Sequence, residues 1–224
     1  MDKPGYYFYP VWDPLLRILH WWNALTMLLQ VATGSIILII LSEKLQDGAG
    51  GWLVTIHAVC GYMFAAGILT RILWLFVGSP TASWRDILPL TANQRKVLLD
   101  TLRYYISALR ETPPLYLAHN PFAGLVYAVF FLLAGGQAIT GSMLLNLPPD
   151  QREQSILIDW HKAGYFLLIL YAAAHVFAVF VHEWAERHGL IPAMIHGKKT
   201  FTGEEWQKLN HTSEEKGGEE RSNN

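Results

Sequence analysis

Two histidines, His161 and His175, lie fourteen residues apart in an otherwise apolar stretch of the sequence. Ionisable side chains are rare inside a membrane and mark functional sites when they occur there. Fourteen residues turn an α-helix through about 1400°, so both side chains project from one stripe, about 21 Å apart along the axis. That distance excludes one shared metal ion. It suits two flat cofactors, each bound by one imidazole of this helix and one of a neighbour.

Two further histidines are candidates for the partner ligands. His20 and His57 each lie near the beginning of another apolar run. Bis-histidine ligation of two b-type haems by His20, His57, His161 and His175 explains all four residues. Glycines share the same stripes, where a missing side chain lets a planar ring approach the backbone. These glycines are Gly34, Gly61 and Gly164.

Other roles for the histidines stay open. Each could make a hydrogen bond across a helical bundle, which is ordinary polar packing in a membrane protein. A chain of histidines could also relay protons. A zinc or copper site would need all its ligands within a few ångströms of one ion, which the two separate levels do not allow.

Four apolar runs must position these residues. They cover roughly residues 18–41, 52–77, 122–146 and 160–183, and each has the length of about 20 residues that crosses a hydrocarbon core of about 30 Å. Charged residues are nearly absent from them, whereas a soluble helical protein carries such residues on its outer faces. The predicted fold class is therefore all-α, an integral membrane four-helix bundle that binds two b haems.

The four runs make residues 18–183 a transmembrane di-haem domain. It is preceded by an N-terminal arm, residues 1–17, whose aromatic residues and prolines suit an extended segment at the membrane interface. It is followed by a polar tail, residues 184–224, in which disorder is expected from about residue 211.

The longest connection, residues 78–118, joins the second and third runs. A stretch from about Asn93 to Arg110 has an amphipathic pattern and is predicted to be a helix on the membrane surface. The third run contains glycines but no histidine. We therefore expect it to pack against the other helices and to supply no haem ligand.

Positive charge is concentrated on one side of the predicted topology. The arm, the 78–118 loop and the tail carry most Lys and Arg residues, and the other side carries Lys44, Arg152 and Lys162. Positive loops stay in the cytoplasm, so both termini are expected to be cytoplasmic. The fourth run then passes inward, which pairs His57 with His161 at the outer level and His20 with His175 at the inner level.

Composition excludes several classes of function. The net charge is −1 and no basic run is dense enough for nucleic acid. Cys60 is the single cysteine, so a disulfide framework or a cysteine-rich metal site is impossible and any iron–sulfur cluster must belong to a partner. No cleavable signal is evident near the N-terminus, and the first apolar run is expected to be retained.

Cations near the haems are expected to neutralise the propionates, because a carboxylate at membrane depth needs a partner. The candidates are Arg17 or Arg71 at the inner level and Lys162 at the outer level. Arg71 follows His57 by fourteen residues and so lies on the same stripe, near the far membrane face. Snorkelling of its guanidinium to water is the alternative.

A quinone site is predicted at the inner haem level. Quinone reduction needs an electron source, a proton source and an apolar slot. His119 and His182 are the titratable candidates at this level, and Arg71 is a candidate donor to a quinone carbonyl. Placement of His119 and His182 at the membrane edge, without such a role, is the alternative. His188 and His196 are expected to be inert residues of the tail.

The sequence around these residues resembles the b-type cytochrome subunits of membrane-bound nickel–iron hydrogenases. The matching segments are Arg17-Ile-Leu-His20-Trp21, Ile56-His57 with Gly61, Arg71-Ile-Leu-Trp74, His119-Asn120-Pro121, Trp160-His161-Lys-Ala-Gly164 and Ala174-His175-Val176. The gamma subunit of membrane formate dehydrogenase and thiosulfate reductase cytochromes look similar in their haem spacing. The His119-Asn120-Pro121 segment and the Arg-Ile-x-Trp run favour the hydrogenase.

The resemblance implies a multi-pass subunit of the bacterial cytoplasmic (inner) membrane. Such a subunit would take electrons from the iron–sulfur small subunit of a hydrogenase, which is bound to the large subunit, and pass them through two haems b to quinone. It would be an electron-transfer subunit, not the hydrogen-activating one. A cytochrome of a formate dehydrogenase or thiosulfate reductase complex is the alternative. A histidine-relay proton channel or transporter, or a purely structural anchor, belongs to a different class.

Overall fold

The computed structural model describes residues 5–44, 51–107, 110 and 114–209 of the 224-residue chain. The chain forms two compact units. The helix unit consists of residues 18–77 and 126–177, and the terminal unit consists of residues 1–17, 78–125 and 178–224.

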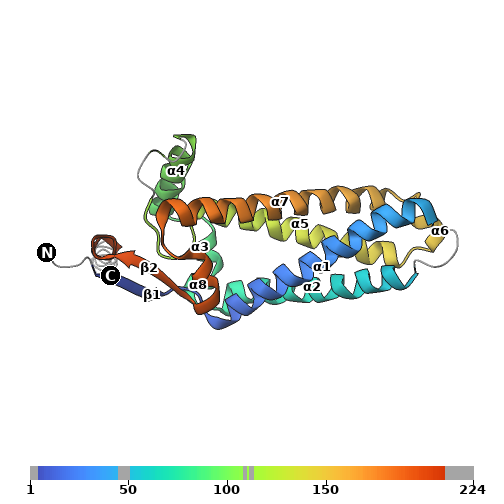
Figure 1. The fold of residues 1–224 in the computed structure, drawn as a ribbon, viewed down its shortest axis with the longest axis horizontal. Coiled ribbons are helices and arrows are strands. Elements are labelled where there is room, and N and C mark those ends of the chain that lie inside the picture. Colours follow the sequence, from blue (N-terminus) through green and yellow to red (C-terminus); the bar gives the residue numbers. More distant parts are fainter. Residues whose placement is uncertain (1–4, 45–50, 108–109, 111–113, 210–224) are drawn as a thin grey trace. The chain divides into compact units, whose positions relative to one another are not determined.

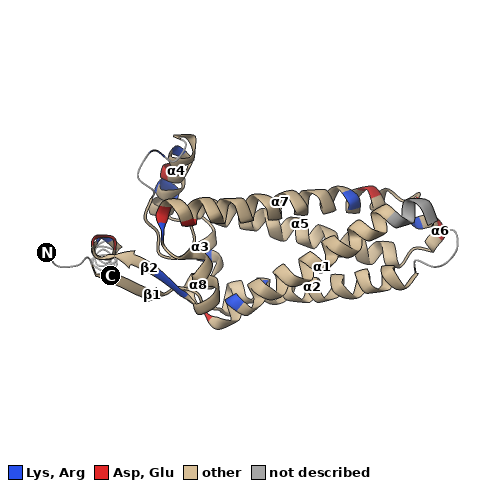
Figure 2. Ribbon diagram, viewed as in Figure 1, with Lys and Arg blue, Asp and Glu red and all other residues tan. Residues whose placement is uncertain are grey.

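Four long helices correspond to the predicted apolar runs (Figure 1). They are α1 (Pro14–Lys44), α2 (Gly51–Val77), α5 (Pro121–Leu145) and α7 (Ile156–Glu186). Each is long and apolar enough to cross a membrane. Figure 2 shows that charged residues are sparse along them. The prediction of four helices of spanning length is thus confirmed.

All four helices begin before the predicted apolar runs, and at two of them the first residue is a proline. Both α1 and α5 begin at a proline, Pro14 and Pro121. Proline suits the first helical position because its φ angle is already helical and its missing N–H group would have no partner there. The first turn of α1 therefore includes the charged Arg17, which a search for apolar residues leaves out.

Large apolar side chains hold the helix unit together. Phe64 and Ile68 of α2, Phe130 and Ala134 of α5 and Leu168 of α7 form its buried core. Other large apolar side chains face outward, and Leu132 is 77% exposed. Such exposure carries no penalty in lipid, because hydrocarbon tails are as apolar as leucine.

The terminal unit contains a two-stranded sheet that the sequence analysis did not predict. Strand β1 (Tyr6–Pro10) pairs antiparallel with β2 (Lys198–Thr202), with Tyr6 opposite Thr202 and Pro10 opposite Lys198. The all-α class is therefore a description of the membrane part only. The predicted N-terminal arm is extended, as expected, but its partner is the tail of the same chain.

The remaining elements are short. They are η2 (Pro80–Ala82), α3 (Trp84–Ile87), α4 (Ala92–Ile106), α6 (Pro149–Arg152) and α8 (Leu190–His196). Helix α4 matches the amphipathic helix expected between Asn93 and Arg110, and it begins with a capping box of Thr91 and Gln94. The disorder expected from residue 211 falls outside the described residues.

Candidate cofactor-binding site

The four intramembrane histidines all lie in the helix unit, where they meet in two pairs. The ring centroids of His57 on α2 and His161 on α7 are 6.2 Å apart, and the rings are inclined by 85°. The centroids of His20 on α1 and His175 on α7 are 6.4 Å apart, with an angle of 57°. These pairs, called the His57 pair and the His20 pair below, have the composition expected from the depth of each residue.

The spacing within each pair fits an iron atom held between two imidazoles. A bond from an imidazole nitrogen to a metal ion is about 2 Å long, so two rings that bind one ion from opposite sides have centres about 6 Å apart. Both pairs match this value. Within the described residues, no group of three or more His, Cys, Asp or Glu side chains could hold a metal ion. Two opposed imidazoles are the ligand set of a bis-histidine haem.

A threonine contacts the Nδ1 atom of each histidine of the His57 pair. The Thr33 Oγ1 atom of α1 lies 2.8 Å from His57 Nδ1, and the Thr140 Oγ1 atom of α5 lies 2.9 Å from His161 Nδ1. The same hydroxyls donate hydrogen bonds of 2.7 Å within their own helices, to the carbonyl oxygens of Leu29 and Gly136.

A glutamine holds the backbone of each of these histidines. Gln30 Nε2 donates to the carbonyl oxygen of His57 at 2.5 Å, and Gln137 Nε2 donates to that of His161 at 3.0 Å. Both glutamines occupy space beside a glycine. A Cβ atom on Gly61 would lie 2.9 Å from Gln30 Nε2, and one on Gly164 would collide with Gln137 Nε2. These two glycines thus make room for glutamine side chains, and their role toward a porphyrin stays a prediction.

The two sets of contacts come from a repeat that the sequence analysis missed. Residues 30–35 read Gln-Val-Ala-Thr-Gly-Ser, and residues 137–142 read Gln-Ala-Ile-Thr-Gly-Ser. The repeated glycines, Gly34 and Gly141, lie against the rings: a Cβ atom would be 3.4 Å from His57 Cε1 and 3.1 Å from His161 Cε1. Comparison of the first apolar run with the third would have found this signal.

The His20 pair has aromatic neighbours. The Trp21 ring meets the His20 ring edge-on, with centroids 5.3 Å apart. The Tyr171 ring is stacked parallel to His175, with centroids 6.2 Å apart and an angle of 2°. The surroundings of the two pairs therefore differ in chemistry: hydroxyl groups at one and aromatic rings at the other.

The three residues predicted to neutralise the propionates, Arg17, Arg71 and Lys162, lie in different environments. Arg71 is 3% exposed, and its guanidinium lies 5.4 Å from the centre of the Tyr127 ring of α5. Arg17 belongs to the terminal unit, where its guanidinium donates to the carbonyl oxygen of Ile195. Lys162 is exposed. Arg71 is buried in the helix unit, which does not match the alternative in which it snorkels to water.

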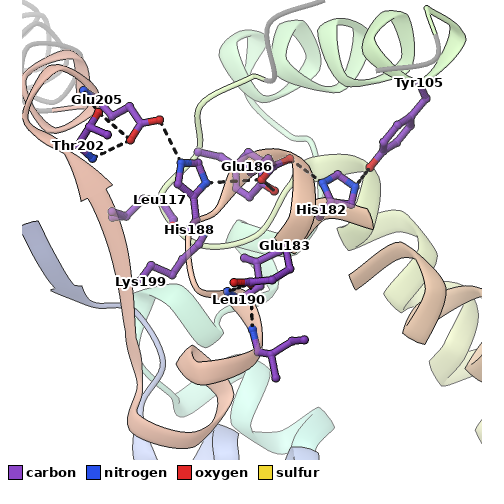
Figure 3. A network of polar contacts seen from close by, with 12 residues as sticks. Tyr105, Leu117, His182, Glu183, Glu186, His188, Leu190, Lys199, Thr202 and Glu205 are labelled. Carbon is purple, nitrogen blue, oxygen red and sulfur yellow. Dashed lines mark hydrogen bonds and ion pairs between the residues drawn. The ribbon is translucent and has the colours of Figure 1, made fainter. Parts of the chain in front are cut away.

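His182 and Glu186, at the end of α7, belong to a cluster of polar side chains in the terminal unit (Figure 3). His182 Nδ1 lies 2.6 Å from Glu186 Oε1, and His182 Nε2 lies 2.7 Å from the Tyr105 hydroxyl. The other oxygen of Glu186 accepts from the Tyr116 hydroxyl at 3.1 Å and lies 3.5 Å from His188 Nδ1. A buried carboxylate therefore joins α7 to two loops.

The cluster continues from Glu186 to the tail. His188 Nε2 lies 3.1 Å from Glu205 Oε1. Burial alone would lower the pKa of His188, but the hydrogen bonds to Glu186 and Glu205 outweigh it and raise this pKa. His188, expected to be inert, is thus a buried member of the cluster.

Lys199 of β2 is another buried charge of the terminal unit. It has no exposed surface. Its ammonium group donates to the carbonyl oxygen of Leu117 at 3.2 Å and lies 4.5 Å from the centre of the Tyr116 ring. Burial lowers its pKa to about 8, although the Glu186 and Asp86 carboxylates act in the opposite direction.

His119, the second titratable candidate for quinone chemistry, also lies in the terminal unit. Its Nδ1 atom is 2.6 Å from Asp86 Oδ2, and its ring centroid is 4.7 Å from that of Trp12. His119 and His182 thus each have a carboxylate within hydrogen-bond distance.

Comparison with known proteins gives a consistent result. The sequence model of a family described as "Prokaryotic cytochrome b561" matches residues 11–197. This range contains all four long helices and both histidine pairs.

Curated relatives match over most of their length. A "Probable Ni/Fe-hydrogenase B-type cytochrome subunit" of Bradyrhizobium diazoefficiens is 26% identical, covering 90% of this chain and 88% of its own. The protein of the same description from Azotobacter vinelandii is 27% identical, with 85% and 88% covered. The "Probable Ni/Fe-hydrogenase 1 B-type cytochrome subunit" of Escherichia coli is 23% identical, with 85% and 90% covered.

Proposed function

The chain belongs to the prokaryotic cytochrome b561 family, and from this membership we propose that it is the membrane-anchoring di-haem cytochrome b subunit of a nickel–iron hydrogenase. It passes electrons from the iron–sulfur small subunit across the bacterial cytoplasmic membrane to quinone. The names of the relatives support the partnership with a hydrogenase.

The observation that carries the proposal is the presence of two imidazole pairs at the spacing of axial ligands. His57 and His161 would hold one haem b, and His20 and His175 the other. When bound, each haem iron accepts and releases one electron. The chain's own residues hold the rings in place: Gln30 and Gln137 bind the backbones of two ligands, and aromatic rings line the other pair.

The proposed topology assigns a level to each histidine pair. With both termini in the cytoplasm, the His57 pair would lie near the outer face, on the side of the hydrogenase subunits that the resemblance implies, and the His20 pair would lie near the inner face. The only cysteine of the chain is Cys60. The iron–sulfur chemistry of the complex therefore belongs to the partner subunits.

Haem content tests the proposal directly. The purified protein is expected to contain two haems b per chain and to show a b-type α band after reduction with dithionite. The ferric form should be low-spin, because the two histidines of a pair would both bind the iron. A protein that inserts into the membrane without haem would refute the proposal and favour a histidine-relay channel. Copurification with a formate dehydrogenase instead of a hydrogenase would correct the partner only.

We also propose that quinone is reduced at the inner level. Two protons must accompany the two electrons, and His182 is linked through Glu186 and His188 to the partly exposed Glu205. A series of such groups can hand protons from water to a buried site. His119, paired with Asp86, is a second candidate donor, and Arg71 is a candidate donor to a quinone carbonyl.

Substitution of these residues should separate haem binding from quinone reduction. The variants Arg71→Leu and His182→Leu are expected to keep both haem spectra and to slow reoxidation of reduced haem by a quinone. Positioned proton donors contribute about 10²–10⁴-fold to rates, so the loss for His182→Leu should be at least about a hundredfold. Stopped-flow absorbance of the α band measures it, with His196→Leu as an exposed control. Unchanged reoxidation in both variants and in His119→Leu would place the quinone elsewhere.

A further inference from the structure

We propose that Thr33 and Thr140 are positioning residues for the His57 pair. Each threonine holds its histidine in the tautomer that carries the proton on Nδ1 and leaves Nε2 free to bind iron. The inference rests on the proposed function, because it assigns these residues a role toward a haem bound at His57 and His161.

The direction of each hydrogen bond follows from the valence of a hydroxyl group. A threonine hydroxyl has one proton to donate and two lone pairs that accept. In both residues the proton is directed to the carbonyl oxygen four residues earlier, at 2.7 Å. The contacts with His57 Nδ1 and His161 Nδ1, at 2.8 Å and 2.9 Å, must then be donated by the imidazoles. A neutral imidazole with a proton on Nδ1 has its free lone pair on Nε2.

The arrangement is made twice by separate helices, which argues against accidental packing. Thr33 lies three residues after Gln30, and Thr140 lies three residues after Gln137. In each case the glutamine holds the backbone of the same histidine whose ring the threonine contacts. Backbone and ring are thus held by one neighbouring helix, and the imidazole cannot rotate away without breaking its contact with the threonine.

The glycine after each threonine allows this approach. A Cβ atom on Gly141 would lie 3.1 Å from His161 Cε1, a distance tighter than ordinary van der Waals contact, and one on Gly34 would lie 3.4 Å from His57 Cε1. A side chain at Gly141 would press on the edge of the His161 ring, and one at Gly34 would just touch the edge of the His57 ring. In the Thr-Gly sequence, the threonine thus contacts Nδ1 of the imidazole and the glycine leaves space for the edge of its ring.

An electronic effect on the bound haem follows. A histidine that donates its Nδ1–H group to an acceptor becomes a more basic ligand through its other nitrogen. A more basic ligand stabilises ferric iron more than ferrous iron, so it lowers the reduction potential. The His20 pair is surrounded by Trp21 and Tyr171 instead. Removal of the hydroxyls should therefore change one haem and leave the other as it was.

The test compares valine and serine variants of the full-length purified protein. Valine has the shape of threonine without the hydroxyl, and serine keeps the hydroxyl without the methyl group. Thr33→Val and Thr140→Val should each raise the midpoint potential of one haem in an anaerobic titration of the α band. Loss of the group that hydrogen-bonds a ligating histidine typically changes the properties of a metal site about 10–100-fold. If the reduction equilibrium changes tenfold, the midpoint potential rises by about 59 mV, because one electron is transferred.

Two kinds of control make the result decisive. Thr33→Ser and Thr140→Ser should retain the wild-type midpoint. Thr70→Val should as well, because the Thr70 hydroxyl donates to the carbonyl oxygen four residues earlier, that of Ala66, on an exposed face. Selective loss of one haem in the valine variants but not in the serine variants would also support the proposal.

The opposite outcomes are equally clear. If the valine variants bind two haems at unchanged potentials, the threonines do not position the ligands, although the proposed function stands. If the serine variants shift or lose the haem as the valine variants do, the methyl group acts through packing and the hydroxyl has no role. A wild-type protein without haem would refute the proposed function itself.

Discussion

Replacement of His57 or His161 by alanine is expected to abolish one and the same haem, and replacement of His20 or His175 is expected to abolish the other. Each single variant should therefore retain half of the wild-type haem. The reason is geometric: the centroid spacings of 6.2 Å and 6.4 Å leave room for one iron between the rings of each pair. Alanine at any of these positions removes one of the two imidazoles that would bind the iron.

Pigment extraction gives the haem content of these variants, and the α band of the reduced protein shows which haem remains. Variants of one pair should have identical spectra, distinct from those of the other pair. His196→Ala, at an exposed histidine near the end of α8, should retain both haems. Equal loss of both haems from every variant, with the protein still inserted, would contradict two separate sites.

Replacement of Glu186 by leucine is expected to open the terminal unit. The Glu186 side chain is 1% exposed and is surrounded by His182, His188 and Tyr116. Leucine removes the buried carboxylate that these three groups share. Removal of one partner of a buried charged pair typically costs about 3–5 kcal/mol. The locally open population should then rise by about a hundredfold or more.

Limited proteolysis of the segment 187–209 measures this opening. Cleavage of Glu186→Leu should be much faster than that of the wild type, with both haem spectra unchanged. Glu204→Leu changes an exposed glutamate in the same segment and should be cleaved at the wild-type rate. If Glu186→Leu resisted the protease equally well, the cluster would not hold the tail.

The same cluster makes the docking of the tail depend on pH. The pKa of His188 is raised by Glu186 and Glu205, against the effect of burial, so its protonated form is favoured in the folded state. The stabilisation of the docked tail by protonated His188 is fully present below the ordinary histidine pKa of about 6.5. It is lost as the pH rises through the raised pKa of His188. Protease resistance of the wild-type tail should therefore fall as the pH rises above this range.

The helical part of the fold could be predicted because its signals are local. Spans of about 20 apolar residues need no knowledge of tertiary structure to be recognised. The periodicity of the helix placed His161 and His175 on one stripe. Because successive spans run in opposite directions, their partners could then be predicted as His57 and His20. Arg71 was harder to place. Its stripe could be predicted, but its position over Tyr127 depends on the packing of α2 against α5.

Features made by distant segments could not be predicted in this way. Strands β1 and β2 are five residues each and lie near opposite ends of the chain. Neither has a sequence pattern that predicts which segment it pairs with. The role of Glu186 depends on His188 and Tyr116, which belong to loops of irregular structure. Thr33 and Thr140 are a different case, because both belong to a Gln-x-x-Thr-Gly-Ser sequence. A comparison of the first apolar run with the third is enough to find this repeat.

The contact between Arg71 and Tyr127 has a consequence for the internal symmetry of the bundle. Tyr127 precedes Gln137 by ten residues, as His20 precedes Gln30, and Arg71 follows His57 by fourteen residues, as His175 follows His161. The two residues thus stand at the positions of the repeat that correspond to His20 and His175, and their side chains also meet, at 5.4 Å. A buried cation on an aromatic ring therefore occupies the place where an exact repeat would put another histidine pair. The helix unit is repeated around the His57 pair, and it is asymmetric at the level of the His20 pair.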